Sequence, residues 1–239
     1  MANIEPIIGR YIWVPYEGTE YRIFFEEAGE GIPLVCLHTA GTDSREWRHQ
    51  LCDAAINKNF RVIAFDLPRH GKSIPPYDWY KEDEEYKLTA KFYAGILMSF
   101  CRELGLDKPV VLGSSMGGNI CMHLAEKYES EFKALIAIEA CEYSPGWHID
   151  WLRHSHIHGG ETCATSVFGL MAPQSPDKYR WETWWYYAQG GPGVFKGDLY
   201  FYSVDHDFRG RSEKLSGKVP IYYMTGIYDF ACTAEMTEE

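Results

Sequence analysis

Short runs of apolar, often β-branched residues alternate along this chain with longer segments in which apolar residues recur every three or four positions. The runs predict buried strands at residues 33–37, 61–65, 109–112, 134–138 and 219–224. The longer segments predict helices at 44–57, 88–104 and 116–128. Strands that alternate with helices favour right-handed crossovers and a mostly parallel, doubly wound α/β sheet, which binds ligands near the carboxyl ends of its strands.

The first thirty residues follow a different pattern. Residues 10–15 and 21–26 are rich in aromatic and β-branched side chains, and the turn-forming sequence Glu17-Gly18-Thr19 separates them. We therefore expect two strands joined by a turn before the alternation begins.

The chain between residues 138 and 219 also departs from the alternating pattern. It is too long for a plain loop and carries many aromatic residues with proline and glycine between them. We expect a helical lid at residues 142–217, inserted into a core formed by residues 1–141 and 218–239.

Length and composition set limits on function. A chain of 239 residues is long enough for one large core plus a lid. A formal net charge of −11 opposes binding to nucleic acid, because phosphates would be repelled. No stretch approaches the ~18 apolar residues that cross a bilayer, so we expect no membrane partner. No cofactor-binding motif is found, and we expect no cofactor.

Cysteine usage indicates a cellular compartment. The 7 cysteines are odd in number and lack C-x-x-C spacing, and most lie within predicted strands or helices. This distribution is typical of free thiols in a reducing environment. The amino-terminal residues also lack the pattern of a secretory signal. We expect a cytoplasmic protein.

The strongest chemical signal is the sequence Gly113-Ser114-Ser115-Met116-Gly117, which joins a predicted strand to a predicted helix. A G-x-S-x-G sequence in this context is a nucleophile elbow, a tight turn that exposes its serine hydroxyl above the sheet. A Cβ at either flanking glycine would collide with neighbouring backbone. The N–H groups at the start of the following helix can stabilise an oxyanion. Ser115 is the predicted nucleophile.

Three further segments lie near the ends of predicted strands. They are His38-Thr39-Ala40-Gly41, Asp66-Leu67-Pro68-Arg69-His70-Gly71-Lys72-Ser73 and Met224-Thr225-Gly226-Ile227-Tyr228-Asp229. Together with the elbow they resemble the α/β-hydrolase superfamily with an inserted lid, over the chain from about Tyr21 to its end. The resemblance implies the α/β-hydrolase fold and a serine hydrolase.

The resemblance also implies roles for individual residues. The backbone N–H groups of Ala40 and Met116 would form the oxyanion hole beside Ser115. Asp229 would be the acid that orients a catalytic histidine. Thr39 stands where the family usually has glycine.

Two alternatives concern the acidic residues. Glu139 ends a predicted strand at which some family members carry their acid, and it remains an alternative to Asp229. Asp66 and His70 belong to a segment that is structural in the family, so we do not expect them to be catalytic.

The catalytic histidine is the difficult assignment. In the family it follows the acid after one more strand, but none of the 9 histidines occupies that place and the chain ends at Glu239. We therefore expect the chain to be incomplete at its carboxyl end and nearly inactive alone. An alternative base would be a lid histidine, and the candidates are His154, His156, His158 and His206. The alternating histidines lack a nearby carboxylate or cysteine at metal-ligand spacing, so no metal site is expected.

The predicted function is hydrolysis of a carboxylic ester, or a related acyl bond, of a small and largely apolar substrate through an acyl-enzyme on Ser115. Aromatic lid residues are expected to line the substrate pocket, namely Trp147, Trp151, Trp184 and Trp185. One alternative is C–C bond hydrolysis of a diketone on the same scaffold. Another is a non-catalytic protein that binds a small molecule. The last predicted strand would leave an open sheet edge, which makes a homo-oligomer a further possibility.

Overall fold

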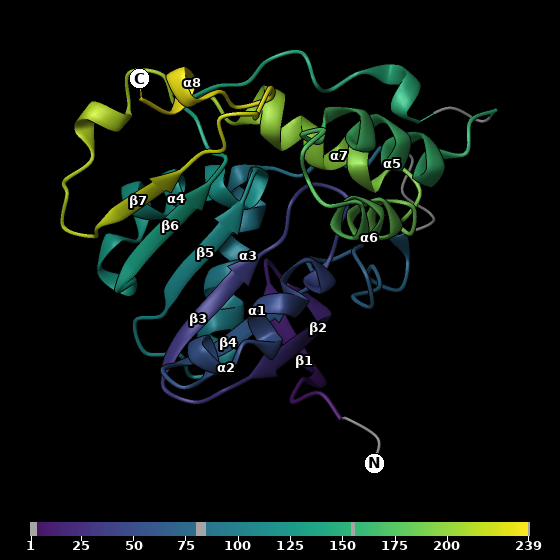
Figure 1. Ribbon diagram of the computed structural model, residues 1–239. Helices are drawn as coiled ribbons and strands as arrows, with labels where there is room; N and C mark the ends of the chain where they lie inside the picture. Colours follow the sequence, from purple (N-terminus) through teal and green to yellow (C-terminus); the bar gives the residue numbers. More distant parts are fainter. Residues whose placement is uncertain (1–3, 80–84, 154–155, 239) are drawn as a thin grey trace.

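The computed structural model describes residues 4–79, 85–153 and 156–238, and its centre is a 7-stranded sheet (Figure 1). The strands are β1 (Ile8–Tyr16), β2 (Thr19–Ala28), β3 (Ile32–Leu37), β4 (Phe60–Phe65), β5 (Val110–Ser114), β6 (Ala134–Ile138) and β7 (Ile221–Met224). Their spatial order is β1-β2-β4-β3-β5-β6-β7. The strands from β4 to β7 in this order are parallel, whereas β1 and β2 pair antiparallel. The predicted α/β class and mostly parallel sheet are confirmed.

Helical segments surround the sheet. The described ones are η1 (Ser44–Trp47), α1 (Arg48–Cys52), α2 (Ala54–Asn57), α3 (Ala90–Glu103), α4 (Met116–Lys127), η3 (Glu129–Glu131), η4 (Asp150–Leu152), α5 (Gly159–Leu170), α6 (Asp177–Tyr187), α7 (Val194–Tyr200), η5 (Phe201–Asp205), η6 (Ser212–Lys214) and α8 (Ala234–Glu238). Helices α5, α6 and α7 come from residues 142–217, which we call the insert. In Figure 1 these three helices lie together beyond the carboxyl ends of the parallel strands.

The single helix expected at 44–57 is instead broken into η1, α1 and α2. The break falls at Asp53, whose backbone is extended with φ −79° and ψ 114°. Its carboxylate accepts hydrogen bonds from the N–H groups of Ala55 and Ile56 and so caps a new helix. A short polar side chain that bonds to nearby backbone favours a cap over a helix interior.

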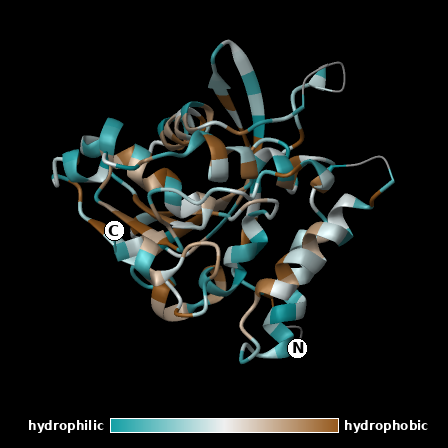
Figure 2. Ribbon diagram, turned by 90° about the horizontal axis from the view of Figure 1, so that it is seen from above, coloured by the Kyte–Doolittle hydropathy of each residue, from teal (hydrophilic) through white to brown (hydrophobic). Residues whose placement is uncertain are grey.

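Alternate strand residues supply the two faces of the core. On β3, Val35 and Leu37 belong to the larger cluster, which also contains residues of α3 and α4. Leu34 and Cys36 face the other way, into a smaller cluster that includes Trp47 of η1 and Leu51 of α1. In Figure 2 the hydrophobic colour appears on both strands and helices. Both faces of the central strands are therefore buried, as the continuous apolar runs predict.

The last strand differs from its neighbours. β7 pairs with β6 and lies at the end of the strand order. Its Tyr222 and Met224 are both 58% exposed.

Among the described residues, no helix is long and apolar enough to cross a membrane.

Candidate active site

Ser115 lies between the end of β5 and the first turn of α4. Its backbone has φ 54° and ψ −113°, in a region that non-glycine residues rarely occupy. The Ser115 N–H donates to the carbonyl oxygen of Ile138 at 2.8 Å, and its own carbonyl accepts from Gly118 and Asn119. The neighbouring strand and the helix start thus hold the strained residue in place, as expected at a functional turn.

The two glycines of the motif are required by close backbone contacts. A Cβ added to Gly113 would lie 1.8 Å from the carbonyl oxygen of Gly117. A Cβ on Gly117 would lie 2.7 Å from the carbonyl oxygen of Leu37. Any side chain at these positions would therefore push the strand and helix apart and move Ser115.

Two backbone N–H groups lie where the resemblance places an oxyanion hole. Ala40 follows β3, and Met116 is the first residue of α4, directly after Ser115. Both residues are buried, with 3% and 0% of their surface exposed. Within the described parts of the chain, neither N–H donates to an acceptor. Unpaired donors beside a strained serine are suited to an oxygen that develops negative charge.

The loop that carries Ala40 is held by two carboxylates. Glu46 Oε2 accepts from the N–H of Thr39 at 2.7 Å and from the hydroxyl of Thr42 at 2.9 Å. Asp198 Oδ2, from α7 of the insert, accepts from the N–H of Gly41 at 2.7 Å. The N–H groups on either side of Ala40 are thus both paired.

Asp198 also joins a buried network that links the insert to the core. Its Oδ2 lies 2.7 Å from His70 Nε2, and both side chains are 0% exposed. Its Oδ1 accepts from the hydroxyl of Tyr86 at 3.1 Å. Burial opposes protonation of His70, but the adjacent carboxylate outweighs it and raises the pKa of the imidazole. His70 therefore has a partner in the insert that its own sequence segment does not reveal.

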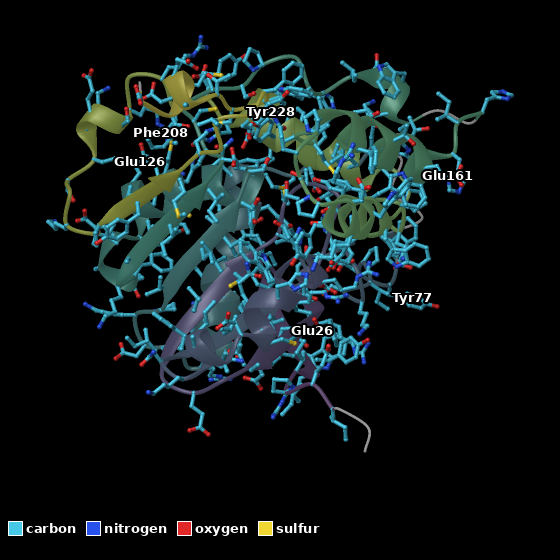
Figure 3. The ribbon with its side chains drawn as sticks, in the orientation of Figure 1. Glu26, Tyr77, Glu126, Glu161, Phe208 and Tyr228 are labelled. Carbon is cyan, nitrogen blue, oxygen red and sulfur yellow. The ribbon has the colours of Figure 1, made fainter. Side chains whose placement is uncertain are left out.

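Asp229 and Glu139 both line the cavity that contains Ser115. Asp229 lies after β7, and its Oδ1 accepts from the N–H groups of Ala231 and Cys232, each at 2.7 Å. Glu139 ends β6 with φ 54°, and its Oε1 accepts from Gly226 N–H at 3.0 Å. The loop after β7 carries Tyr228, which Figure 3 labels near the insert. The two acids that sequence reasoning left as alternatives are thus brought to the same cavity.

The surroundings of Glu139 favour its protonated form. Burial, and then the neighbouring Asp229 carboxyl, raise the pKa of Glu139 to about 8. Its Oε2 is buried and has no hydrogen-bond partner in the described structure. Glu139 therefore keeps its proton near neutral pH, and a protonated carboxyl does not offer the negative charge that an imidazolium needs.

The cavity has a volume of about 460 Å³ and lies between the sheet and the insert. From α5 and the residue after it come Val167, Leu170 and Met171. From α7 and η5 come Leu199 and Tyr202. Its floor includes Ser115, while the insert supplies much of its apolar surface, so the cavity has the size and lining of a small-molecule site.

Three of the four tryptophans predicted to line the pocket lie elsewhere. Trp147 lines the cavity, whereas Trp151, Trp184 and Trp185 do not, and Trp151 and Trp185 are 46% and 59% exposed. The face of α6 that lines the cavity carries Tyr179, Glu182, Thr183 and Tyr186. These four residues follow the i, i+3, i+4, i+7 spacing of one helix face, which places the tryptophans of α6 on other faces. This spacing is visible in the sequence and could have predicted the lining face, but the prediction is based on the tryptophans instead.

The histidines proposed as alternative bases are placed elsewhere or lie outside the described residues. His206 is buried, with Nδ1 2.9 Å from His123 Nε2 and Nε2 2.8 Å from the carbonyl oxygen of Cys141. His156 and His158 are exposed, and His154 lies outside the described residues. The described part of the chain holds no cluster of potential metal ligands.

His49 is a lining residue that sequence reasoning missed. It belongs to α1, and its Nε2 lies 3.1 Å from both carboxylate oxygens of Glu182. Its sequence context gave no signal, because the two residues lie 133 positions apart.

Comparison with known proteins identifies the family to which this fold belongs. The family model of the alpha/beta hydrolase fold matches residues 32–156. The chain therefore belongs to the alpha/beta hydrolase fold family.

Individual relatives give more detail. The chain is 31% identical over 139 residues to a 2-hydroxy-6-oxononadienedioate/2-hydroxy-6-oxononatrienedioate hydrolase of Burkholderia vietnamiensis, a match that spans 57% of this chain and 46% of that protein. This chain thus matches about half the length of that relative. A thermophilic esterase from Thermogutta terrifontis has a similar structure, with a TM-score of 0.77 and 22% identity over 96% of this chain and 84% of that one. The enol-lactonase from Burkholderia xenovorans gives a TM-score of 0.78 and 19% identity over 96% and 85%.

Proposed function

We propose that this protein is a serine hydrolase that cleaves a carboxylic ester or related acyl bond through an acyl-enzyme on Ser115. The observation that carries the proposal is the strained Ser115 on the floor of an apolar cavity, beside the unpaired N–H groups of Ala40 and Met116. The membership of the alpha/beta hydrolase fold family supports it.

The chemistry follows from these positions. The Ser115 hydroxyl oxygen attacks the acyl carbon while a histidine imidazole takes the hydroxyl proton. No described contact pairs Ser115 with a histidine, so the residue that supplies this base is left unassigned. The N–H groups of Ala40 and Met116 stabilise the oxyanion, and one such donor is typically worth ~3 kcal/mol. The alcohol leaves with that proton, and water then cleaves the acyl-enzyme by the same route. Asp229 is the acid in this mechanism, because Glu139 keeps its proton near neutral pH.

A second candidate is C–C bond hydrolysis of a diketone, supported by the similarity to the 2-hydroxy-6-oxononadienedioate/2-hydroxy-6-oxononatrienedioate hydrolase of Burkholderia vietnamiensis. It would use the same serine and the same cavity. The two reactions differ in the bond cleaved, so a panel of p-nitrophenyl esters and a vinylogous diketone separates them. Release of p-nitrophenol without turnover of the diketone supports the ester hydrolase, and the reverse result supports the second candidate.

A fluorophosphonate probe tests whether Ser115 is the nucleophile of this protein. We expect adduct formation on Ser115, complete loss of labelling in Ser115→Ala, and retained labelling in Ser114→Ala. Ser114 is a matched control because it also lines the cavity and precedes the nucleophile by one residue. Labelling that persists in Ser115→Ala would remove Ser115 from the mechanism. A correctly folded protein that takes no label would favour a non-catalytic binding protein.

A further inference from the structure

The polar lining of the cavity is acidic. The carboxyl groups of four residues line it, namely Glu46, Glu139, Glu182 and Asp229. Neither lysine nor arginine occurs among the described residues of the lining. A ligand that fills the cavity therefore meets carboxyl groups without a compensating cationic side chain on the wall.

Three of these carboxyl groups are either paired with another group or protonated, and so present little free negative charge to a ligand. Glu182 forms an ion pair with Arg48, whose Nε lies 3.1 Å from Glu182 Oε1 and which is outside the lining, and His49 Nε2 lies 3.1 Å from the other oxygen. Glu139 keeps its proton near neutral pH. In the proposed mechanism Asp229 pairs with the catalytic imidazole. Only Glu46 is left to act on the substrate.

Glu46 is held by hydrogen bonds and, among the described residues, has no ion-pair partner. Its Oε2 accepts from Thr39 N–H and the Thr42 hydroxyl, and these donors are dipoles rather than charges. No lysine or arginine in the described ranges forms an ion pair with it. Burial raises the pKa of Glu46 to about 7, although the hydrogen bonds oppose that rise. A cation beside Glu46 would stabilise the ionised form of its carboxyl group.

Aromatic rings share the cavity with Glu46. Tyr187 lines the same cavity, and burial, then the Glu46 charge, raise the pKa of its phenol. Phe195 stands edge to face with Tyr187, with ring centroids 5.7 Å apart, and also lines the cavity. Ring faces attract ammonium groups in desolvated sites. An aromatic wall next to an unbalanced carboxylate has the chemistry of a site for an organic cation.

We propose that this cavity selects substrates by charge through Glu46: an acyl substrate with an ammonium group binds more tightly than its uncharged isostere, and one with a carboxylate binds least. The identity of the cavity as the substrate site rests on the proposed function, but the order of affinities does not depend on acyl transfer. A dicarboxylate would be disfavoured in this cavity.

Three matched amides test the proposal without chemistry. They are the N-benzyl amides of 4,4-dimethylpentanoic acid, 3-(trimethylammonio)propanoic acid and succinic acid, which differ at the tail as tert-butyl, trimethylammonium and carboxylate. Quenching of tryptophan fluorescence reports binding, because Trp147 lines the cavity. At low salt and pH 7.5, between the pKa of about 7 for Glu46 and that of about 8 for Glu139, Glu46 is mostly ionised and Glu139 mostly protonated. Under these conditions we expect the ammonium amide to bind at least tenfold more tightly than the carboxylate amide, with the tert-butyl amide between them.

Variants assign the effect to Glu46. In Glu46→Gln the spread between the ammonium and carboxylate amides should shrink to less than threefold, while Gln still accepts the bonds from Thr39 and Thr42. Glu213→Gln removes an equal charge at an exposed position and should keep the wild-type spread. A carboxylate amide that binds as tightly as the tert-butyl amide, or a spread that survives in a folded Glu46→Gln, would overturn the proposal.

The design separates this proposal from the proposed function. In Ser115→Ala the order of the three amides should be unchanged, because the tail does not contact the nucleophile. Loss of labelling together with a retained order would support both proposals. Absence of labelling in the wild type with a retained order would refute the hydrolase and leave the charge selection intact.

Discussion

The cavity has two sides that differ in how they are held. We call the side formed by Ser115 and the loop with Ala40 the floor, and the side formed by helices α5 and α6 of the insert the roof. The floor positions Ser115 and the N–H groups of Ala40 and Met116 through backbone atoms that are buried and tightly packed. The roof is made by side chains of α5 and α6, and some of its rings are exposed, such as Trp185 at 59%. At Gly113 an added Cβ would meet a backbone atom at 1.8 Å, but at Gly169 in α5 it would meet nothing within 4 Å. The reacting atoms thus depend on backbone geometry, and the shape of the substrate space depends on replaceable side chains.

Paired glycine variants give the largest expected contrast between floor and roof. Gly113→Ala should lower the free energy of unfolding by about 4 kcal/mol or more, because its Cβ overlaps backbone that cannot move aside. Gly169→Ala should change it by less than ~1 kcal/mol and in the stabilising direction, because alanine favours a helix. Urea unfolding measures both. Equal effects would show that the floor is as adaptable as the roof.

The contacts of Asp198, which connect the insert to the loop after β3, should contribute almost as much to the free energy of unfolding. Asp198→Ala leaves His70 without its buried partner and Gly41 without an acceptor, and breaking such a pair costs about 3–5 kcal/mol. Asp177→Ala removes an exposed ion pair of α6 with Arg180 and should cost less than ~1 kcal/mol. Urea unfolding of the two variants checks the ratio. A mild effect of Asp198→Ala would mean that the insert is held by its apolar contacts alone.

Glu46 should make the stability of the folded protein depend on pH. Its pKa is raised to about 7 in the folded protein from 4.5, mainly by burial. The folded state therefore binds this proton more tightly, and the stability it contributes is lost as pH rises from about 4.5 to 7. Relative to wild type, Glu46→Gln should gain on the order of 1–3 kcal/mol between pH 5 and pH 8. Thermal melts at the two pH values test the sign, and a difference that falls with pH would contradict it.

The smallest effect is expected at the outer surface of the roof. Trp185→Ala should change the free energy of unfolding by no more than ~0.5 kcal/mol, because the ring is largely exposed. A loss above 2 kcal/mol, measured by urea unfolding, would show that this ring packs against a surface that the described residues do not supply.

The predictable parts of the molecule are those whose causes are local in the sequence. The elbow could be found because a strand, two obligatory glycines and a helix start are consecutive, and the buried parallel strands because both of their faces are apolar. The break at Asp53 is also local, but it depends on a side-chain cap that the apolar spacing of 44–57 concealed.

Other features depend on contacts between distant residues. Asp198 holds Gly41 across 157 positions, so neither residue signals the other. Trp184 and Trp185 of α6 are expected in the pocket as aromatic residues of the lid, whereas the helical spacing of Tyr179 and Tyr186 decides which face of α6 lines it. Neither Glu46 nor His49 lies in a recognisable motif. Their roles follow from the position of α6 and the loop after β3 around the cavity.

The most direct test of the account is a crystal structure of the natural protein with a small alkyl boronic acid. The account predicts a covalent bond from Ser115 Oγ to boron, with one boronate oxygen about 2.7–3.1 Å from the backbone nitrogens of both Ala40 and Met116. The alkyl group should extend into the cavity beneath α6. A boronic acid bonded to another residue, or a boronate oxygen turned away from both N–H groups, would contradict the assignment of Ser115 and its oxyanion hole.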